Sequence, residues 1–218
     1  MRIPLTAHGR RELCLYGVPL LAASVVSAAL GWYWLTAALA IVLVWMVSFF
    51  RDPHRAVPEG PKLLVSPADG RVTEITDCDD ARVDGAAKRV SIFLSIFNVH
   101  INRAPCAGKV VEVTYAPGKK LNAMNPESAR VNESNTIVLE GDDPAGVRVL
   151  VKQISGAIAR RIVCTCAPGA TLARGERFGM IKFGSRTDLY VSAERLVEIT
   201  VAVGDRVKAG KTVIGVLK

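Results

Sequence analysis

The chain has 218 residues and a formal net charge of +8, and half of its residues are hydrophobic. That length suits one soluble domain of about 160 residues plus a further element. The positive charge suits an anionic partner, and since the basic residues are scattered rather than clustered with aromatic ones, a membrane with acidic lipids is favoured over nucleic acid. The five cysteines have no regular spacing, which argues against a disulfide scaffold and favours a reducing compartment.

The N-terminal segment is predicted to anchor the protein to a membrane. No charged residue occurs between Leu13 and Phe50, a run too long for a secretory signal. The run can hold two short helices, residues 16–30 and 34–50, separated by Gly31 and an aromatic cluster. Arginines flank both ends, so the positive-inside rule places both ends in the cytoplasm. A helical hairpin satisfies this rule, whether it spans the bilayer or enters it shallowly. A hairpin buried in a soluble core is the alternative.

After this segment, residues 51–61 form a basic linker, because its prolines prevent a continuing helix. Its arginines suit either membrane anchoring or a role with the substrate. From residue 62 to 218 the pattern is β, with short apolar or alternating runs separated by Gly, Pro, Asn and Asp. The expected strands are 63–65, 71–75, 90–97, 109–115, 136–140, 147–154, 161–164, 196–203 and 212–217. We therefore predict a mainly β fold, a compact barrel or sandwich domain preceded by an N-terminal hydrophobic helical hairpin (residues 1–50).

Few side chains of the β region could transfer protons near neutral pH. Of the three histidines, His8 lies in the N-terminal arm and His54 in the linker. His100 follows the expected strand 90–97, from which a side chain can project, although a lone histidine is often structural. Asp69 precedes a glycine, where a turn alone would explain an aspartate.

Two of the five cysteines lie close enough in the sequence to be considered as metal ligands. Cys164 and Cys166 could be half of such a site, but no second pair or nearby histidine completes it. They are interpreted as buried strand residues, and no metal is expected.

The stretch from Gly175 to Asp188 is too rich in glycine and charge for a helix, and it contains a Gly-Ser pair before a short apolar run. Gly184 has no Cβ to block an attacking hydroxyl, and Ser185 supplies that hydroxyl. Attack on the preceding carbonyl would convert the amide into an ester, and β-elimination would then break the chain. Hydrolysis would leave a pyruvoyl group, whose carbonyl forms imines with amines. Most Gly-Ser pairs are ordinary turns, so the pair alone does not decide.

The longer stretch resembles phosphatidylserine decarboxylase of the short bacterial and archaeal type. The resemblance extends over most of the chain from Phe49 onward, through Phe50-Arg51-Asp52-Pro53-His54-Arg55, Ser66-Pro67-Ala68-Asp69-Gly70, Phe97-Asn98-Val99-His100-Ile101-Asn102 and Asn132-Glu133-Ser134-Asn135. It implies that the bond between Gly184 and Ser185 cleaves itself and that Ser185 becomes a covalent pyruvoyl (pyruvate) cofactor. The mature protein would then be a heterodimer of its own two chains. It also implies a lipoyl-like β architecture. Lys208 does not lie in the exposed hairpin of a true carrier, so swinging-arm chemistry is not expected.

The same resemblance implies roles for three residues. His100 matches the family's histidine that activates the serine, and Asp69 matches the residue that orients this histidine. With Ser185 they would form a serine-protease-like triad that acts once, on its own chain. Larger bacterial members carry a second histidine, implicated in decarboxylation, where this chain has Phe97. The resemblance therefore leaves the proton donor for decarboxylation open, and His100 is a candidate for both steps.

The predicted function is conversion of phosphatidylserine into phosphatidylethanolamine and CO2, at the cytoplasmic side of the cell membrane, with a phospholipid substrate and without nucleic acid. An archaetidylserine-type or other aminophospholipid decarboxylase is an alternative, because the sequence does not define the lipid backbone, and further oligomerisation is open. A membrane-tethered zinc peptidase of the lysostaphin type needs several histidine ligands, whereas the β region offers His100 alone. A non-catalytic lipoyl-like β module on a membrane anchor would predict an intact chain.

Overall fold

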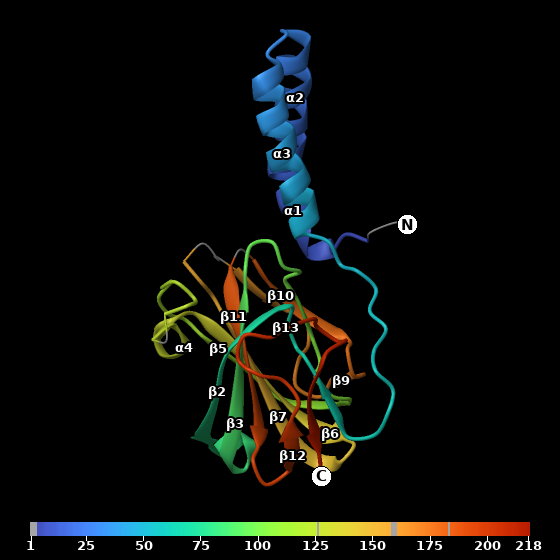
Figure 1. Ribbon diagram of the computed structural model, residues 1–218, viewed down its shortest axis with the longest axis vertical. Coiled ribbons are helices and arrows are strands. Elements are labelled where there is room, and N and C mark those ends of the chain that lie inside the picture. Colours follow the sequence, from blue (N-terminus) through green and yellow to red (C-terminus); the bar gives the residue numbers. More distant parts are fainter. Residues whose placement is uncertain (1–3, 126, 158–160, 183) are drawn as a thin grey trace. The chain divides into compact units, whose positions relative to one another are not determined.

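The computed structural model describes residues 4–125, 127–157, 161–182 and 184–218. It divides into two compact units, Met1–His54 and Arg55–Lys218, with the boundary inside the predicted linker. The first unit is helical and the second is built from strands (Figure 1). The predicted class, a mainly β fold preceded by hydrophobic helices, is confirmed.

The helical unit is a hairpin of two apolar arms. The first arm consists of a 3-10 turn (Ala7–Gly9), α1 (Arg10–Glu12), a π-helical turn (Leu13–Gly17) and α2 (Val18–Ala29). The second arm is α3 (Tyr33–Phe49). The chain reverses at Gly31, whose φ of +73° is a left-handed conformation that favours glycine. The hydroxyls of Ser27 and Thr36 lie 2.8 Å apart and join α2 to α3. Because α2 ends at Ala29 and α3 begins at Tyr33, the predicted break between two helices is confirmed.

Large apolar side chains on this hairpin point away from the unit. Trp34 exposes 92 % of its surface and Ile41 exposes 70 %. Among the described residues, one helix, Ala7–Ala29, is long and apolar enough on its own to cross a membrane, and α3 is shorter. Apolar surface of this kind is unfavourable in water and favourable in lipid.

The second unit contains one large antiparallel sheet and two small ones. The large sheet has the order β13-β2-β3-β11-β7-β6-β5-β9, and the small sheets have the orders β1-β14-β12 and β4-β10-β8. The strands are β1 (Leu63–Val65), β2 (Gly70–Asp80), β3 (Gly85–Leu94), β4 (Ile101–Arg103), β5 (Gly108–Ala116), β6 (Ser134–Asp142), β7 (Ala145–Ile154), β8 (Arg161–Cys164), β9 (Thr171–Leu172), β10 (Arg177–Lys182), β11 (Ser185–Ser192), β12 (Leu196–Ile199), β13 (Arg206–Val207) and β14 (Val213–Leu217). Apart from a 3-10 turn (Ala81–Val83), the helical structure described in this unit is the single turn α4 (Ser128–Val131).

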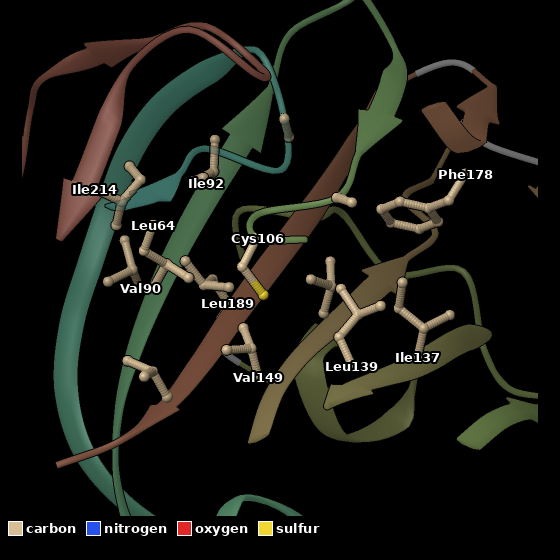
Figure 2. Packing of buried hydrophobic residues seen from close by; sticks show 14 of the residues in the cluster. Leu64, Val90, Ile92, Cys106, Ile137, Leu139, Val149, Phe178, Leu189 and Ile214 are labelled. Atoms are coloured by element: carbon tan, nitrogen blue, oxygen red, sulfur yellow. The ribbon is translucent and has the colours of Figure 1, made fainter. Parts of the chain in front are cut away.

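The core lies between the inner face of the curled large sheet and the two small sheets. Figure 2 shows Val149 of β7 and Leu189 of β11 on the large sheet, with Leu64 of β1 and Phe178 of β10 in the same cluster. Side chains alternate along β11 because successive strand residues point to opposite faces. Leu189 therefore joins this core, and Tyr190 packs against a smaller cluster on the other face.

The predicted strand 90–97 is wrong at its end, because β3 stops at Leu94. The side chain of Asn98 accepts hydrogen bonds from the backbone N–H and the hydroxyl of Ser95, at 2.9 and 2.8 Å, and closes a turn. His100 consequently does not follow that strand directly: it lies just before β4. The predicted strand 196–203 is also too long, since β12 ends at Ile199.

Candidate active site

The Gly-Ser pair lies where β10 and β11 are joined. Ser185 is the first residue of β11 and pairs with Leu94 of β3, while the next residue, Arg186, pairs with Ile154 of β7. Gly184 has a φ of +64°, which is strained for any residue with a Cβ. Phe183, part of the predicted cleavage stretch, lies outside the described residues. The pair thus begins a central strand of the sheet in a conformation that selects glycine.

Ser185 is completely buried, and its Oγ has no hydrogen-bond partner among the described residues. A buried hydroxyl that makes no hydrogen bond costs roughly 1–3 kcal/mol. Such groups are uncommon in native proteins, and each calls for an explanation. The sequence predicted this hydroxyl as the nucleophile, and that role stays a prediction.

The imidazole of His100 is also fully buried and faces the same peptide segment. Its Nδ1 lies 3.0 Å from the carbonyl oxygen of Asn98, and the N–H of Gly184 donates to its Nε2 at 3.3 Å. A carbonyl oxygen only accepts hydrogen bonds, so Nδ1 carries the proton, and Nε2 presents its lone pair to the backbone beside Ser185. A general base at this place needs this tautomer.

Asp69 lies in the turn before β2 and is almost fully buried. Its Oδ1 accepts a hydrogen bond from the N–H of Ala209 at 2.8 Å, and its Oδ2 forms an ion pair with Arg55 at 2.7 Å. Its turn lies against β4, because the carbonyl of Pro67 accepts from the backbone N–H of Arg103 at 3.0 Å. Asp69 is therefore held close to the strand that follows His100. Direct orientation of His100 by Asp69 stays a prediction.

Three neighbours of the pair were not recognised from the sequence. Gly156 approaches the carbonyl oxygen of Gly184 so closely that a Cβ would collide with it. The carbonyl of Asn98 supplies the acceptor for His100 Nδ1. Arg186 is buried on the opposite face of β11, where it donates to Asp188 and to the hydroxyl of Ser91, both at 2.6 Å. The contacts of Gly156 with Gly184 and of Arg186 with Ser91 join residues far apart in the chain, so local sequence carries little sign of them.

The turn between β3 and β4 forms one side of this site. A Cβ built on Gly184 would lie 3.8 Å from the side chain of Ile96, and the neighbouring Phe97 is 68 % exposed. An aromatic hydrocarbon ring cannot donate or accept a proton, so Phe97 cannot act as an acid or base at this site.

Cys164 and Cys166 lie side by side, with their sulfur atoms 3.5 Å apart, and both pack against the core. Hydrogen bonding from Cys166 lowers the pKa of Cys164 to about 6, and the same contact raises the pKa of Cys166. Among the described residues, no group of three or more His, Cys, Asp or Glu side chains is arranged to hold a metal. The predicted burial of this pair is found only in part, since both residues are partly exposed.

Comparison with known proteins decides the family. Residues 42–215 match the family model for phosphatidylserine decarboxylase. The phosphatidylserine decarboxylase proenzyme of Rhodopirellula baltica is 46 % identical over 97 % of this chain and 87 % of its own length. That of Symbiobacterium thermophilum is 46 % identical over 99 % of this chain and 97 % of its own, and that of Carboxydothermus hydrogenoformans is 42 % identical over the whole of both chains.

The chain belongs to the phosphatidylserine decarboxylase family. The resemblance inferred from the motifs is thereby confirmed, together with the predicted activity, a carboxy-lyase acting on phosphatidylserine. This result decides against a zinc peptidase and a non-catalytic β module. The relatives are named proenzymes, which implies that phosphatidylserine decarboxylases of this kind are processed before they act.

Proposed function

We propose that this phosphatidylserine decarboxylase matures by cleaving its own chain between Gly184 and Ser185, and that Ser185 becomes the pyruvoyl group. The main support is the buried Ser185 Oγ, which has no hydrogen-bond partner in the described part of the chain and lies beside a glycine in a left-handed conformation. The Nε2 lone pair of His100 faces the same peptide segment. These are the nucleophile, a glycine without a Cβ to block its attack, and the base that an acyl shift needs.

The proposed reaction begins when rotation of the Ser185 side chain brings Oγ to the carbonyl carbon of Gly184. Nε2 of His100 takes the hydroxyl proton and passes it to the departing amide nitrogen, so the amide becomes an ester. Loss of the Cα proton of residue 185 then expels the Gly184 carboxylate and leaves a dehydroalanine. One water molecule replaces its nitrogen, which leaves as ammonia. No residue is lost, and the two products are residues 1–184 and 185–218.

The cofactor fits this position because Ser185 provides it without any further binding site. Once formed, the pyruvoyl carbonyl supplies an electrophile that binds the substrate amine and withdraws the electrons left by departing CO2. In the uncleaved chain residue 185 is buried away from bulk solvent. We propose that His100 also returns the proton to the substrate carbon, because Phe97 cannot do so. Asp69 would help to hold His100 in its reactive orientation.

Intact-mass measurement of the purified full-length protein tests this proposal. We expect two chains, residues 1–184 and 185–218. The smaller chain should be blocked to Edman sequencing, should gain the mass of a hydrazine reagent, and should be trapped on its substrate by borohydride. A single intact chain that still decarboxylates phosphatidylserine would overturn the pyruvoyl mechanism. A single intact and inactive chain would contradict self-cleavage as well.

We further propose that residues 1–50 anchor the enzyme, residues 51–61 link the anchor to the catalytic domain, and residues 62–218 form that domain on the cytoplasmic side of the membrane. The supporting observations are the exposed apolar side chains of the hairpin and the arginines at both ends of its uncharged run. The substrate lipid then need not leave the bilayer.

Deleting residues 1–50 is expected to release a folded β domain from membranes, because the apolar surface of α2 and α3 is removed while the core of the second unit is retained. Sedimentation with vesicles in high salt measures the effect, with the full-length chain as the control. Continued sedimentation of the truncated protein would mean that the hairpin is not the main anchor.

A further inference from the structure

Asn102 has a fully buried side chain that makes three hydrogen bonds. Its Nδ2 donates to Oγ1 of Thr187 at 3.1 Å and to the carbonyl of Pro67 at 3.4 Å. Its Oδ1 accepts from Nε2 of Gln153 at 2.9 Å. One amide therefore joins β4 to β11, to β7 and to the turn before β2.

Asn102 and two of its hydrogen-bond partners each lie two residues away from a member of the proposed triad. Asn102 follows His100 by two residues, and Thr187 follows Ser185 by two residues on β11. Pro67 precedes Asp69 by two residues in its turn. Because strand residues two apart point to the same face, Thr187 lies on the face of β11 that carries the Ser185 hydroxyl. The three segments that carry nucleophile, base and carboxylate thus meet at one side chain.

The contact is part of a longer buried chain of amides. Nδ2 of Asn135 on β6 donates to Oε1 of Gln153 at 3.1 Å, and Gln153 in turn donates to Asn102. Asn135, Gln153 and Thr187 are all buried. In a buried network of this kind each missing partner leaves a polar group unsatisfied, so the network holds its members in one arrangement.

We propose that Asn102 is a positioning residue for self-cleavage: it holds the segments of His100, Asp69 and Ser185 in register in the uncleaved chain. The inference rests on the proposed function, since it concerns the same reaction. Asn102 acts through its neighbours and not on the reacting atoms. Displacement of a reacting group by about 1 Å can slow a reaction by about 100-fold, so even a small shift between β4 and β11 would be measurable.

The test compares variants of the full-length chain made by cell-free synthesis, with the appearance of the 185–218 fragment followed in time. Thr187→Val keeps the side-chain volume but removes the hydroxyl, whereas Thr187→Ser removes a methyl group but keeps the hydroxyl. We expect Thr187→Val and Asn102→Ala each to slow cleavage by about 10- to 100-fold. Thr187→Ser should cleave close to the wild-type rate. The double variant should be no slower than the slower single variant, because the contact that Thr187→Val removes is already lost in Asn102→Ala.

Loss of stability alone predicts a different pattern. Val149→Ala opens a cavity in the core on β7, away from this network. It should lower the melting temperature without slowing cleavage at temperatures well below melting. If Asn102→Ala does not fold, the Thr187 pair decides on its own. The inference is overturned if Thr187→Val cleaves like the wild type, or if Thr187→Ser is the slower of the two. A wild-type chain that stays intact would instead refute the proposed function.

Discussion

Ser185→Ala is expected to leave a single full-length chain with no decarboxylase activity. The substitution removes the buried hydroxyl, and no other residue can supply the carbonyl at position 185. In hydrolytic triads, loss of the nucleophile lowers kcat by about 10⁶-fold, so no cleavage should be detectable, and without cleavage there is no pyruvoyl group for decarboxylation. Denaturing electrophoresis measures cleavage, and release of CO2 from phosphatidylserine vesicles measures activity.

Ser192→Ala is the matched control, because Ser192 is a second buried serine, at the opposite end of β11. It should cleave and act normally. Ser185→Cys should cleave slowly, since a thiol can make the same acyl shift. Processing of Ser185→Ala at the predicted bond, or activity in the uncleaved variant, would refute the assignment of the nucleophile.

His100→Ala is expected to stop cleavage almost completely, because it removes the Nε2 lone pair that lies against the N–H of Gly184, the residue before Ser185. Asp69→Asn should slow cleavage by at most about 10⁴-fold, the effect of the corresponding change in a serine protease. A smaller effect is expected if the carbonyl of Asn98 alone maintains the tautomer of His100. Rates of fragment formation in freshly synthesised chains measure both effects, and His54→Ala in the linker serves as the control.

Arg55→Gln separates two roles of Asp69, since Arg55 is its ion-pair partner. If Asp69 acts on His100, Asp69→Asn should slow cleavage more than Arg55→Gln does. If Asp69 only fastens the linker to the β unit, the two variants should behave alike. Normal processing of His100→Ala would remove the proposed base and with it the triad.

The sequence predicted much of the fold, because most strands carry their own signal. The limits predicted for β1 and β8 agree with the structure. β10 and β11 were not predicted as strands, although they position the site. β10 contains Gly179, where a Cβ would collide with the carbonyl of Val163. β11 buries Arg186 and Asp188, which resemble surface residues until their ion pair is seen. The close approach at Gly179 and the further hydrogen bond from Arg186 to Ser91 depend on partners that are distant in the chain.

The site was predicted as a set of residues but not as an arrangement. Ser185, His100 and Asp69 came from their motifs, and their roles remain predictions. Asn102 belongs to one of those motifs too, but its importance emerges only from contacts with Pro67 and Thr187 across the fold. Local sequence indicates which side chains could do chemistry. It does not indicate which ones hold the others in place.

The position of β11 between β3 and β7 has a consequence for the life of the mature enzyme. Cleavage before Ser185 would cut the covalent chain but none of the ladder hydrogen bonds on either side of this strand. The proenzyme folds as one molecule, whereas the mature enzyme could unfold only by separating into two polypeptides. Its thermal stability would then depend on protein concentration, and recovery after denaturation would require two chains to find each other in solution. Unfolding of the mature enzyme would thus be largely irreversible, whereas unfolding of the proenzyme is a reversible equilibrium. The lifetime of the mature enzyme would then depend on how slowly it unfolds.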